Sequence, residues 1–383
     1  MSVIFRLKNS AVGVFKITKW CIRLILVLTG IVSMARCSSG YKEKDGKVTF
    51  NGEEITDKNF IVLNDVFAKD DSTAYYKRYS IDDADVATFT GLDRHYAKDK
   101  NLVFYCDEER EGQNYYLTKH SVIIKVKGAI PATFTILGDG HEGYAKDHKR
   151  GYFKGAGFDV KDVATLSVIE GQFTKDKYQV YFKQVPVKGA DANSFRTIGN
   201  FYAKDTARVY YYGHHNEVYN DIYEIPCSVA SFTVLDYPYA KDATSVFYIH
   251  TKINEADAAS FSILGNDFSK DKNHVYFKTK IVKGADAASF KILPQDENAR
   301  DGAYYSKDKN HAFWKEKMFS VKDIAAFKVL PLGYATDNKH IYFHTGIVKG
   351  ADVATFKTEE HGYGDWDAED ARSKYLAGVK VME

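Results

Sequence analysis

The hydrophobic positions of this chain recur in a fixed pattern built around aspartates. Nine times an aromatic residue stands three positions before an Asp, and two adjacent aromatics stand five and six positions after it. Five of the eight spacings between these aspartates are 29 residues, and the others are 48, 37 and 37. A fixed period of about 20–50 residues is typical of repeat proteins, so we predict one continuous array, although length alone suggests two or three domains. The nine aspartates are Asp70, Asp99, Asp147, Asp176, Asp205, Asp242, Asp271, Asp308 and Asp337.

Within one unit the residues predict short strands separated by turns. A polar turn follows the Asp, as at 271–273, because Asp and Asn side chains bond the nearby backbone. The run at 275–277, Val-Tyr-Phe, has the β-branched and aromatic residues that suit a pleated strand. After a Lys-Gly turn comes a second Asp, here Asp286, which we interpret as the N-cap of one helical turn that Phe290 closes. A second strand, Phe-x-Ile-Leu at 290–293, completes a unit of about three strands.

A unit of this size cannot bury its apolar face alone, whereas stacked neighbours can. We therefore predict a mainly β fold of tandem hairpin repeats of about 29 residues in an open stack or solenoid. A closed, propeller-like ring is the alternative, although propeller blades usually have about 40 residues or more. The expected segments are a signal at 1–37, a partial repeat or cap at 38–66, the nine-unit array at 67–360, and a degraded repeat or cap at 361–383.

Aromatic residues number 56, and the repeat positions account for 35 of them. Most are therefore expected to form the core and the contacts between units. Adjacent aromatics on a strand point to opposite faces. Unless both faces of the strand are buried, one ring of each pair lies near the surface. A surface that stacks on a sugar or a base is therefore the alternative.

The net charge of +2 is unevenly distributed. Residues 1–36 carry six basic side chains and no acid, so the remainder has a charge of 2 − 6 = −4. Lys and Asp alternate along every unit, and we interpret the Lys-Asp dipeptides as a solvated rim. This balance argues against a nucleic-acid partner, which requires a basic stripe.

The N-terminal segment resembles a bacterial lipoprotein signal. Its apolar run at 24–32 is too short for a typical membrane-spanning helix and matches the hydrophobic region of a secretion signal. The run ends near Cys37, the residue that is lipidated in such signals, although Arg36 stands where a small residue is usual. An uncleaved N-terminal anchor is the alternative. Both place residues 38–383 outside the cytoplasm, at the cell envelope and most directly facing the periplasm.

Two cysteines remain in the folded part, Cys106 and Cys227. They lie several units apart, whereas a disulfide requires Cα atoms within about 7 Å. In an open stack we therefore expect two buried or half-buried free thiols. In a closed ring the two could meet.

Three units carry the signature Asp-Lys-Asn-x-x-aromatic-aromatic, at 99–105, 271–277 and 308–314. The chain resembles the DKNYY family of bacterial proteins, which is named for this signature, over about residues 41–360. The resemblance implies an exported or lipid-anchored repeat protein. It implies no catalytic residues.

The period lengthens at 107–127, 213–226 and 294–304. Insertions in a repeat array often form loops on one face, which is frequently the binding face, although tolerated surface insertions look the same. The candidate partner-binding residues of these loops are Asp107, Glu108, Glu109, Tyr115, Tyr116, His214, His215 and Glu217.

No motif predicts catalysis, a cofactor or a metal. The chain has no nucleophile elbow, P-loop or dinucleotide fingerprint. His214, His215 and Glu217 lack the spacing of a zinc site. The Asp-Lys-Asn turns place a Lys where a calcium loop clusters oxygen ligands, so we assign the aspartates a turn-forming role.

The sequence therefore predicts a non-enzymatic, envelope-anchored repeat lipoprotein that binds a protein partner or ligand through its insertion loops or a concave face. An immunity protein that neutralises an envelope-targeted toxin is the first alternative, because acidic insertions would suit a cationic toxin. A hydrolase acting on envelope polymers is the second, and it would need carboxylates from the insertions to converge.

Overall fold

The computed structural model describes residues 40–56, 59–110, 119–140, 142–170, 172–213, 222–294, 304–359 and 365–381. The chain separates into two compact units, Met1–Asn193 and Ser194–Glu383. We describe each unit by itself.

The first unit contains strands β1 to β19 and one short 3₁₀ turn. They are β1 (Tyr41–Lys44), β2 (Lys47–Phe50), β3 (Glu53–Ile55), β4 (Ile61–Val62), β5 (Phe67–Lys69), β6 (Ala74–Tyr76), β7 (Tyr79–Ile81), β8 (Thr90–Gly91), β9 (Tyr96–Lys98), β10 (Val103–Glu109), β11 (His120–Lys125), β12 (Thr135–Ile136), β13 (Tyr144–Lys146), β14 (Gly151–Phe153), β15 (Ala156–Phe158), η1 (Val163–Thr165), β16 (Ser167–Val168), β17 (Phe173–Lys175), β18 (Val180–Phe182) and β19 (Val185–Pro186).

The second unit contains strands β20 to β43 and a second 3₁₀ turn. They are β20 (Arg196–Gly199), β21 (Tyr202–Lys204), β22 (Val209–Tyr211), β23 (Tyr223–Ile225), β24 (Thr233–Val234), β25 (Tyr239–Lys241), β26 (Val246–Tyr248), β27 (Thr251–Ile253), β28 (Ser262–Gly265), β29 (Phe268–Lys270), β30 (Val275–Phe277), β31 (Lys280–Ile281), β32 (Lys291–Ile292), β33 (Tyr305–Lys307), β34 (Ala312–Trp314), β35 (Lys317–Phe319), β36 (Lys328–Val329), η2 (Pro331–Gly333), β37 (Tyr334–Thr336), β38 (Ile341–Phe343), β39 (Gly346–Ile347), β40 (Lys357–Thr358), β41 (Ala368–Glu369), β42 (Lys374–Leu376) and β43 (Val379–Lys380).

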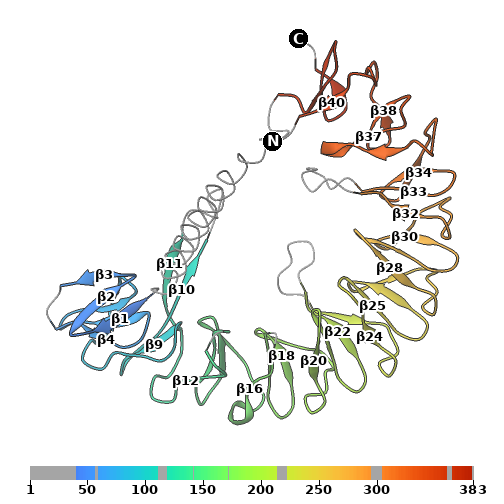
Figure 1. Ribbon diagram of the computed structural model, residues 1–383. Helices are drawn as coiled ribbons and strands as arrows, with labels where there is room; N and C mark the ends of the chain where they lie inside the picture. Colours follow the sequence, from blue (N-terminus) through green and yellow to red (C-terminus); the bar gives the residue numbers. More distant parts are fainter. Residues whose placement is uncertain are drawn as a thin grey trace, which may run out of the picture. The chain divides into compact units, whose positions relative to one another are not determined.

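These strands form separate antiparallel sheets. A three-stranded sheet, β1 to β3, comes first, and ten four-stranded sheets follow, each made of strands that are consecutive in the chain. Within each unit the sheets succeed one another in chain order (Figure 1). No described sheet joins strands from both ends of the chain, and none closes into a barrel. The predicted mainly β fold of open tandem repeats is therefore confirmed. Within the described ranges no helix is long and apolar enough to span a bilayer.

From β4 onward each repeat forms a four-stranded sheet, so the expected number of about three strands in a repeat is wrong. The additional strand is the last in each sheet, and in most sheets it follows the aromatic pair after a tight turn, as β31 follows β30. It escaped prediction because two or three residues are too few to show an alternating pattern. The turn residue before it, such as Lys278 (φ 56°), has the left-handed backbone that a two-residue hairpin requires.

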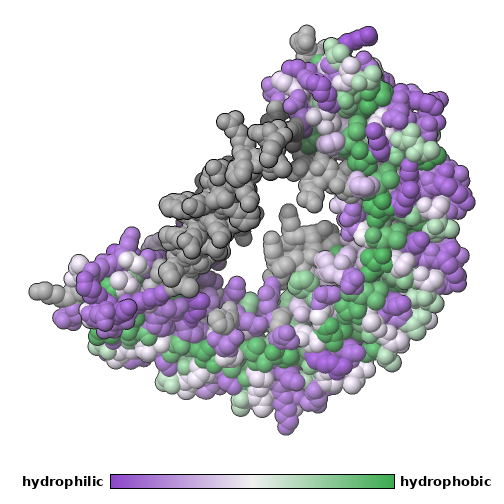
Figure 2. All heavy atoms as spheres, viewed as in Figure 1, coloured by the Kyte–Doolittle hydropathy of each residue, from purple (hydrophilic) through white to green (hydrophobic). Residues whose placement is uncertain are grey.

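Most sheets pack between two neighbours and bury both faces, which decides where the paired aromatics lie. In the sheet β28 to β31, Tyr276 packs against Tyr239 and Val246 of the preceding sheet. The next residue, Phe277, belongs to the core that includes Phe313 of the following sheet. Both rings are buried, so the pair leaves no ring at the surface for stacking on a ligand. In the second unit, hydrophobic residues follow one another through successive sheets with hydrophilic residues on either side (Figure 2).

The last sheet, β40 to β43, is built on a tenth copy of the motif. Asp370 accepts hydrogen bonds from the Tyr375 hydroxyl and from the backbone N–H of Asp352, both at 2.8 Å. The aromatic pattern is absent because Asp367 and Leu376 replace two of the three aromatics. These are the positions that elsewhere face a following sheet, and no described sheet packs there. Aromatic side chains on that side would therefore have no described sheet to pack against. Leu376 is 39% exposed.

Candidate functional site

The repeated aspartates organise the turns of the scaffold. One carboxylate oxygen of Asp271 accepts the N–H groups of Asn273 and His274, both at 2.7 Å. The other oxygen accepts the Tyr276 hydroxyl and the N–H of Asp257, both at 2.8 Å. The carboxylate thus has four donors from the protein itself, which is the turn-forming role that the sequence predicted. The same arrangement recurs at Asp147, Asp176 and Asp337.

A lysine precedes eight of the nine aspartates. Seven of these lysines donate hydrogen bonds to backbone carbonyls, so the interpretation of a solvated rim is wrong. Lys307 donates from its half-buried ammonium to the carbonyls of Ile324 (2.8 Å) and Phe327 (3.1 Å) in the next turn. Eight of the nine aspartates are at most 4% exposed. These groups are buried because the turns between sheets leave carbonyls and N–H groups that need partners. The same lysine contact recurs at Lys69, Lys98, Lys146, Lys175, Lys241 and Lys270.

Such a turn is consequently held by two successive sheets. In the turn that begins at Asp257, Lys241 of the preceding sheet donates to the Ala258 carbonyl at 2.9 Å, while Asp271 holds the N–H of Asp257. The carboxylate of Asp257 accepts the N–H of Ser260 at 2.8 Å, which confirms the predicted cap. Asp162 departs from the pattern, because its side chain makes no capping hydrogen bond.

The carboxylate network makes the stability of the fold depend on acid pH. Burial by itself raises the pKa of Asp337, but hydrogen bonds from Tyr342 and the backbone lower it to about 2 from 3.8. The unfolded chain therefore binds more protons than the folded chain between about pH 4 and pH 2, and stability is lost as pH falls through this window. We expect urea midpoints to be steady from neutral pH down to about pH 5 and to decline below that. Asp337→Asn should make the decline of the urea midpoint below about pH 5 smaller than in the wild type. A wild-type midpoint that stays constant down to about pH 2 would contradict this account.

The acidic residues predicted to form a binding loop lie instead on strand β10. Asp107 accepts the hydroxyl of Tyr105 at 2.9 Å. Glu108 forms ion pairs with Lys77 (2.7 Å) and Lys119 (3.0 Å), whereas Glu109 is exposed. The insertion lengthens a hairpin. Two of these three carboxylates form contacts within the first unit.

The other predicted residues, Cys37, Tyr115, Tyr116, His214, His215 and Glu217, lie outside the described residues. Across the ranges that are described, no three His, Cys, Asp or Glu side chains form a group that could hold a metal. Cys106 is buried, Cys227 is half-buried, and both are free thiols, as expected. Burial raises the pKa of the Cys227 thiol to about 11, so it is protonated at neutral pH.

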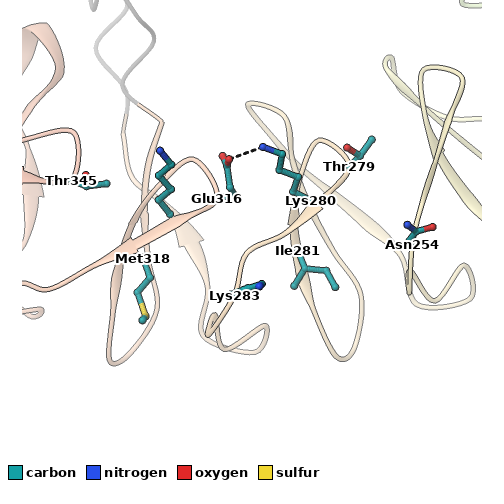
Figure 3. Close-up of a pocket in the computed structure, with 9 residues that line it drawn as sticks. Asn254, Thr279, Lys280, Ile281, Lys283, Glu316, Met318 and Thr345 are labelled. Atoms are coloured by element: carbon teal, nitrogen blue, oxygen red, sulfur yellow. Dashed lines mark hydrogen bonds and ion pairs between the residues drawn. The ribbon is translucent and has the colours of Figure 1, made fainter.

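A groove of about 700 Å³ crosses the edge strands of the second unit (Figure 3). We call it the edge-strand groove. Its residues come from the last strands and adjoining turns of four consecutive sheets, which is why their approach could not be inferred from spacing alone. They are Asn254, Thr279, Lys280, Ile281, Lys283, Glu316, Lys317, Met318 and Thr345.

The edge-strand groove has an excess of positive charge. Lys280 and Glu316, from adjacent sheets, form an ion pair at 2.9 Å (Figure 3). Burial raises the pKa of Glu316, but the hydrogen bonds from Lys280 and the backbone, together with the charges of Lys280 and Lys317, outweigh it. The pKa is therefore lowered and the carboxylate is ionised at neutral pH. No described carboxylate pairs with Lys283 or Lys317. The residues that line the groove thus include three lysines and one glutamate.

The floor of the groove combines apolar side chains with backbone groups that have no partner among the described residues. Val282 N donates to Val275 O at 2.8 Å, so the neighbouring pair, Tyr276 and Ile281, is the non-hydrogen-bonded pair of this hairpin. The N–H and C=O of Ile281 therefore point away from β30. Met318 has the same place in β35, opposite Phe313, and its side chain is 50% exposed.

Comparison with known proteins assigns the chain to a family. The model of the DKNYY family matches residues 8–108, 109–251 and 239–378. No curated protein and no solved structure matches the chain. The three family matches together span most of the chain and include the repeats in which the signature was recognised. The protein therefore belongs to the DKNYY family.

Proposed function

We propose that this protein is a non-enzymatic binding scaffold, exported and anchored to the bacterial cell envelope, that holds a partner at the surface of its repeat array. The observation that carries the proposal is a contrast between the polar residues of the repeats, which bond to one another, and those of the edge-strand groove. The repeated Asp, Lys and Tyr groups are used in hydrogen bonds between sheets, as at Asp271 and Lys307. The edge-strand groove, by contrast, contains Lys283 and Lys317, which form no ion pair with any described carboxylate, beside the exposed side chain of Met318.

The anchoring part of the proposal is supported by the basic and apolar character of residues 1–36 and by Cys37. We expect Cys37→Ser to abolish labelling of the protein by an alkyne fatty acid in living cells, because the thiol is the acceptor of the lipid. Ser38→Ala is the matched control and should be labelled like the wild type. Equal labelling of Cys37→Ser, or no labelling of the wild type, would contradict lipidation at this residue.

The binding part is tested by affinity capture with the full-length protein. The detergent-extracted protein would be immobilised and exposed to envelope extract and culture supernatant, and the retained proteins would be identified by mass spectrometry. One partner at near-equal stoichiometry is the expected result. If the retained partner is a toxin, and it is no longer retained after residues 107–127 or 213–226 are replaced, an immunity role would be favoured. Retention of no protein would overturn the scaffold proposal.

A further inference from the structure

We propose that the edge-strand groove binds an acidic polypeptide segment in an extended conformation. This inference rests on the proposed binding function and names the chemical class of its partner. Three features of the groove carry it: the charge of its side chains, the free backbone of its edge strands and its apolar, non-aromatic composition.

The charge of the groove selects an anionic partner. Glu316 is already neutralised by Lys280 across the two sheets, which leaves Lys283 and Lys317 as the cations that a ligand would meet. Both belong to the groove, and no described carboxylate forms an ion pair with either. Carboxylates of a bound segment would complete these pairs, and opposite charges placed in this way favour the correct partner over neutral or cationic ones.

The backbone of the groove selects a polypeptide. Ile281 and Met318 each direct an N–H and a C=O away from their own hairpins, so the hydrogen-bonding groups of two edge strands are open on this side. An extended peptide can pair with such an edge, and its alternate side chains then face the sheet. Ile281 and Met318 also supply apolar surface for the side chains between the acidic ones.

The composition of the groove disfavours a polysaccharide. Sugar binding by ring stacking requires aromatic side chains, and none of the groove residues is aromatic. The volume of about 700 Å³ lies within the range of ligand-binding clefts. A flexible methionine in the floor suits a peptide because it can adapt to different apolar side chains.

The test measures the affinity of the full-length protein for a fluorescein-labelled peptide of alternating Glu and Val by fluorescence anisotropy. We expect binding that weakens as salt is raised, because the charges of the groove are partly exposed. The double variant Lys283→Glu with Lys317→Glu should weaken binding at least about tenfold. The matched control is Lys188→Glu with Lys349→Glu, which has the same change in net charge. Both control lysines are exposed and occupy the repeat position of Lys283 outside the groove, so the expected change is less than about twofold.

A second probe tests the extended conformation. The same peptide with alternate amides N-methylated keeps its charge but cannot pair with a strand edge, and we expect it to bind at least about tenfold more weakly. Equal affinity of the two peptides would overturn the pairing with the edge strands. Equal affinity of the wild type and the Lys283/Lys317 double variant would overturn the site. If dextran sulfate binds at the groove and the peptide does not, the polypeptide inference is overturned and the ligand is an anionic polysaccharide.

The outcomes separate this inference from the scaffold proposal. If affinity capture retains a partner whose binding is unchanged in the Lys283/Lys317 double variant, and the acidic peptide does not bind, the scaffold function stands and the inference about the groove fails. If the peptide binds at the groove but no protein is retained from envelope or supernatant, the site stands and the scaffold function fails.

Discussion

Asp271→Ala is expected to lower the free energy of unfolding by about 3–5 kcal/mol, because it leaves several donors without an acceptor in a buried place. The lost acceptor serves the N–H groups of Asn273, His274 and Asp257, and the hydroxyl of Tyr276. Urea unfolding followed by circular dichroism would measure the loss. Hydrogen exchange would locate it, with the fastest exchange expected at the amides of Asp257, Asn273 and His274.

Graded variants distinguish the carboxylate network from a general loss of packing. Tyr276→Phe removes one of the four hydrogen bonds and should cost about 1 kcal/mol. Asp271→Asn keeps one oxygen but replaces the other with an amide nitrogen, which donates and cannot accept hydrogen bonds. Its loss of stability should therefore fall between those of Tyr276→Phe and Asp271→Ala. Asp257→Ala removes a half-buried cap and should have a smaller effect than Asp271→Ala. A loss below about 1 kcal/mol for Asp271→Ala would mean that water replaces the carboxylate without penalty.

Phe268→Ala is expected to cost about 3–5 kcal/mol and to uncouple two neighbouring sheets. Phe268 is fully buried, and its ring lies 4.9 Å from that of Phe277 and 5.6 Å from that of Phe290. These residues share one core with Phe313 of the next sheet. In a repeat protein the interface between neighbours is a separate contribution to stability. The urea transition should therefore broaden or split, and hydrogen exchange should accelerate on both sides of this core.

Tyr178→Ala is the control, because this aromatic is 58% exposed and lies outside the repeated aromatic positions. We expect its unfolding free energy to stay within about 0.5 kcal/mol of the wild type. Equal losses for Phe268→Ala and Tyr178→Ala would contradict the assignment of the repeated aromatics to the cores between sheets.

The sequence predicted the local parts of the fold because local chemistry determines them. The turn at Asp271 and the cap at Asp257 each depend on donors that lie two or three residues away. Both could therefore be predicted from the sequence. The strand at 275–277 is equally local, since β-branched and aromatic residues favour it wherever they stand. The tandem arrangement followed from the period, because each such unit needs a neighbour to bury its apolar face.

The sequence alone therefore determined the repeats, their turns and the family, whereas the tertiary structure decided which groups are buried and which approach each other. Lys307 and Asp271 looked solvated in the sequence, since charged residues usually are. Their partners lie in neighbouring turns 14 to 20 residues away, so only the stacking of sheets could reveal the contacts. The edge-strand groove depends on the same stacking, because it joins short strands from successive units that have no pattern of their own.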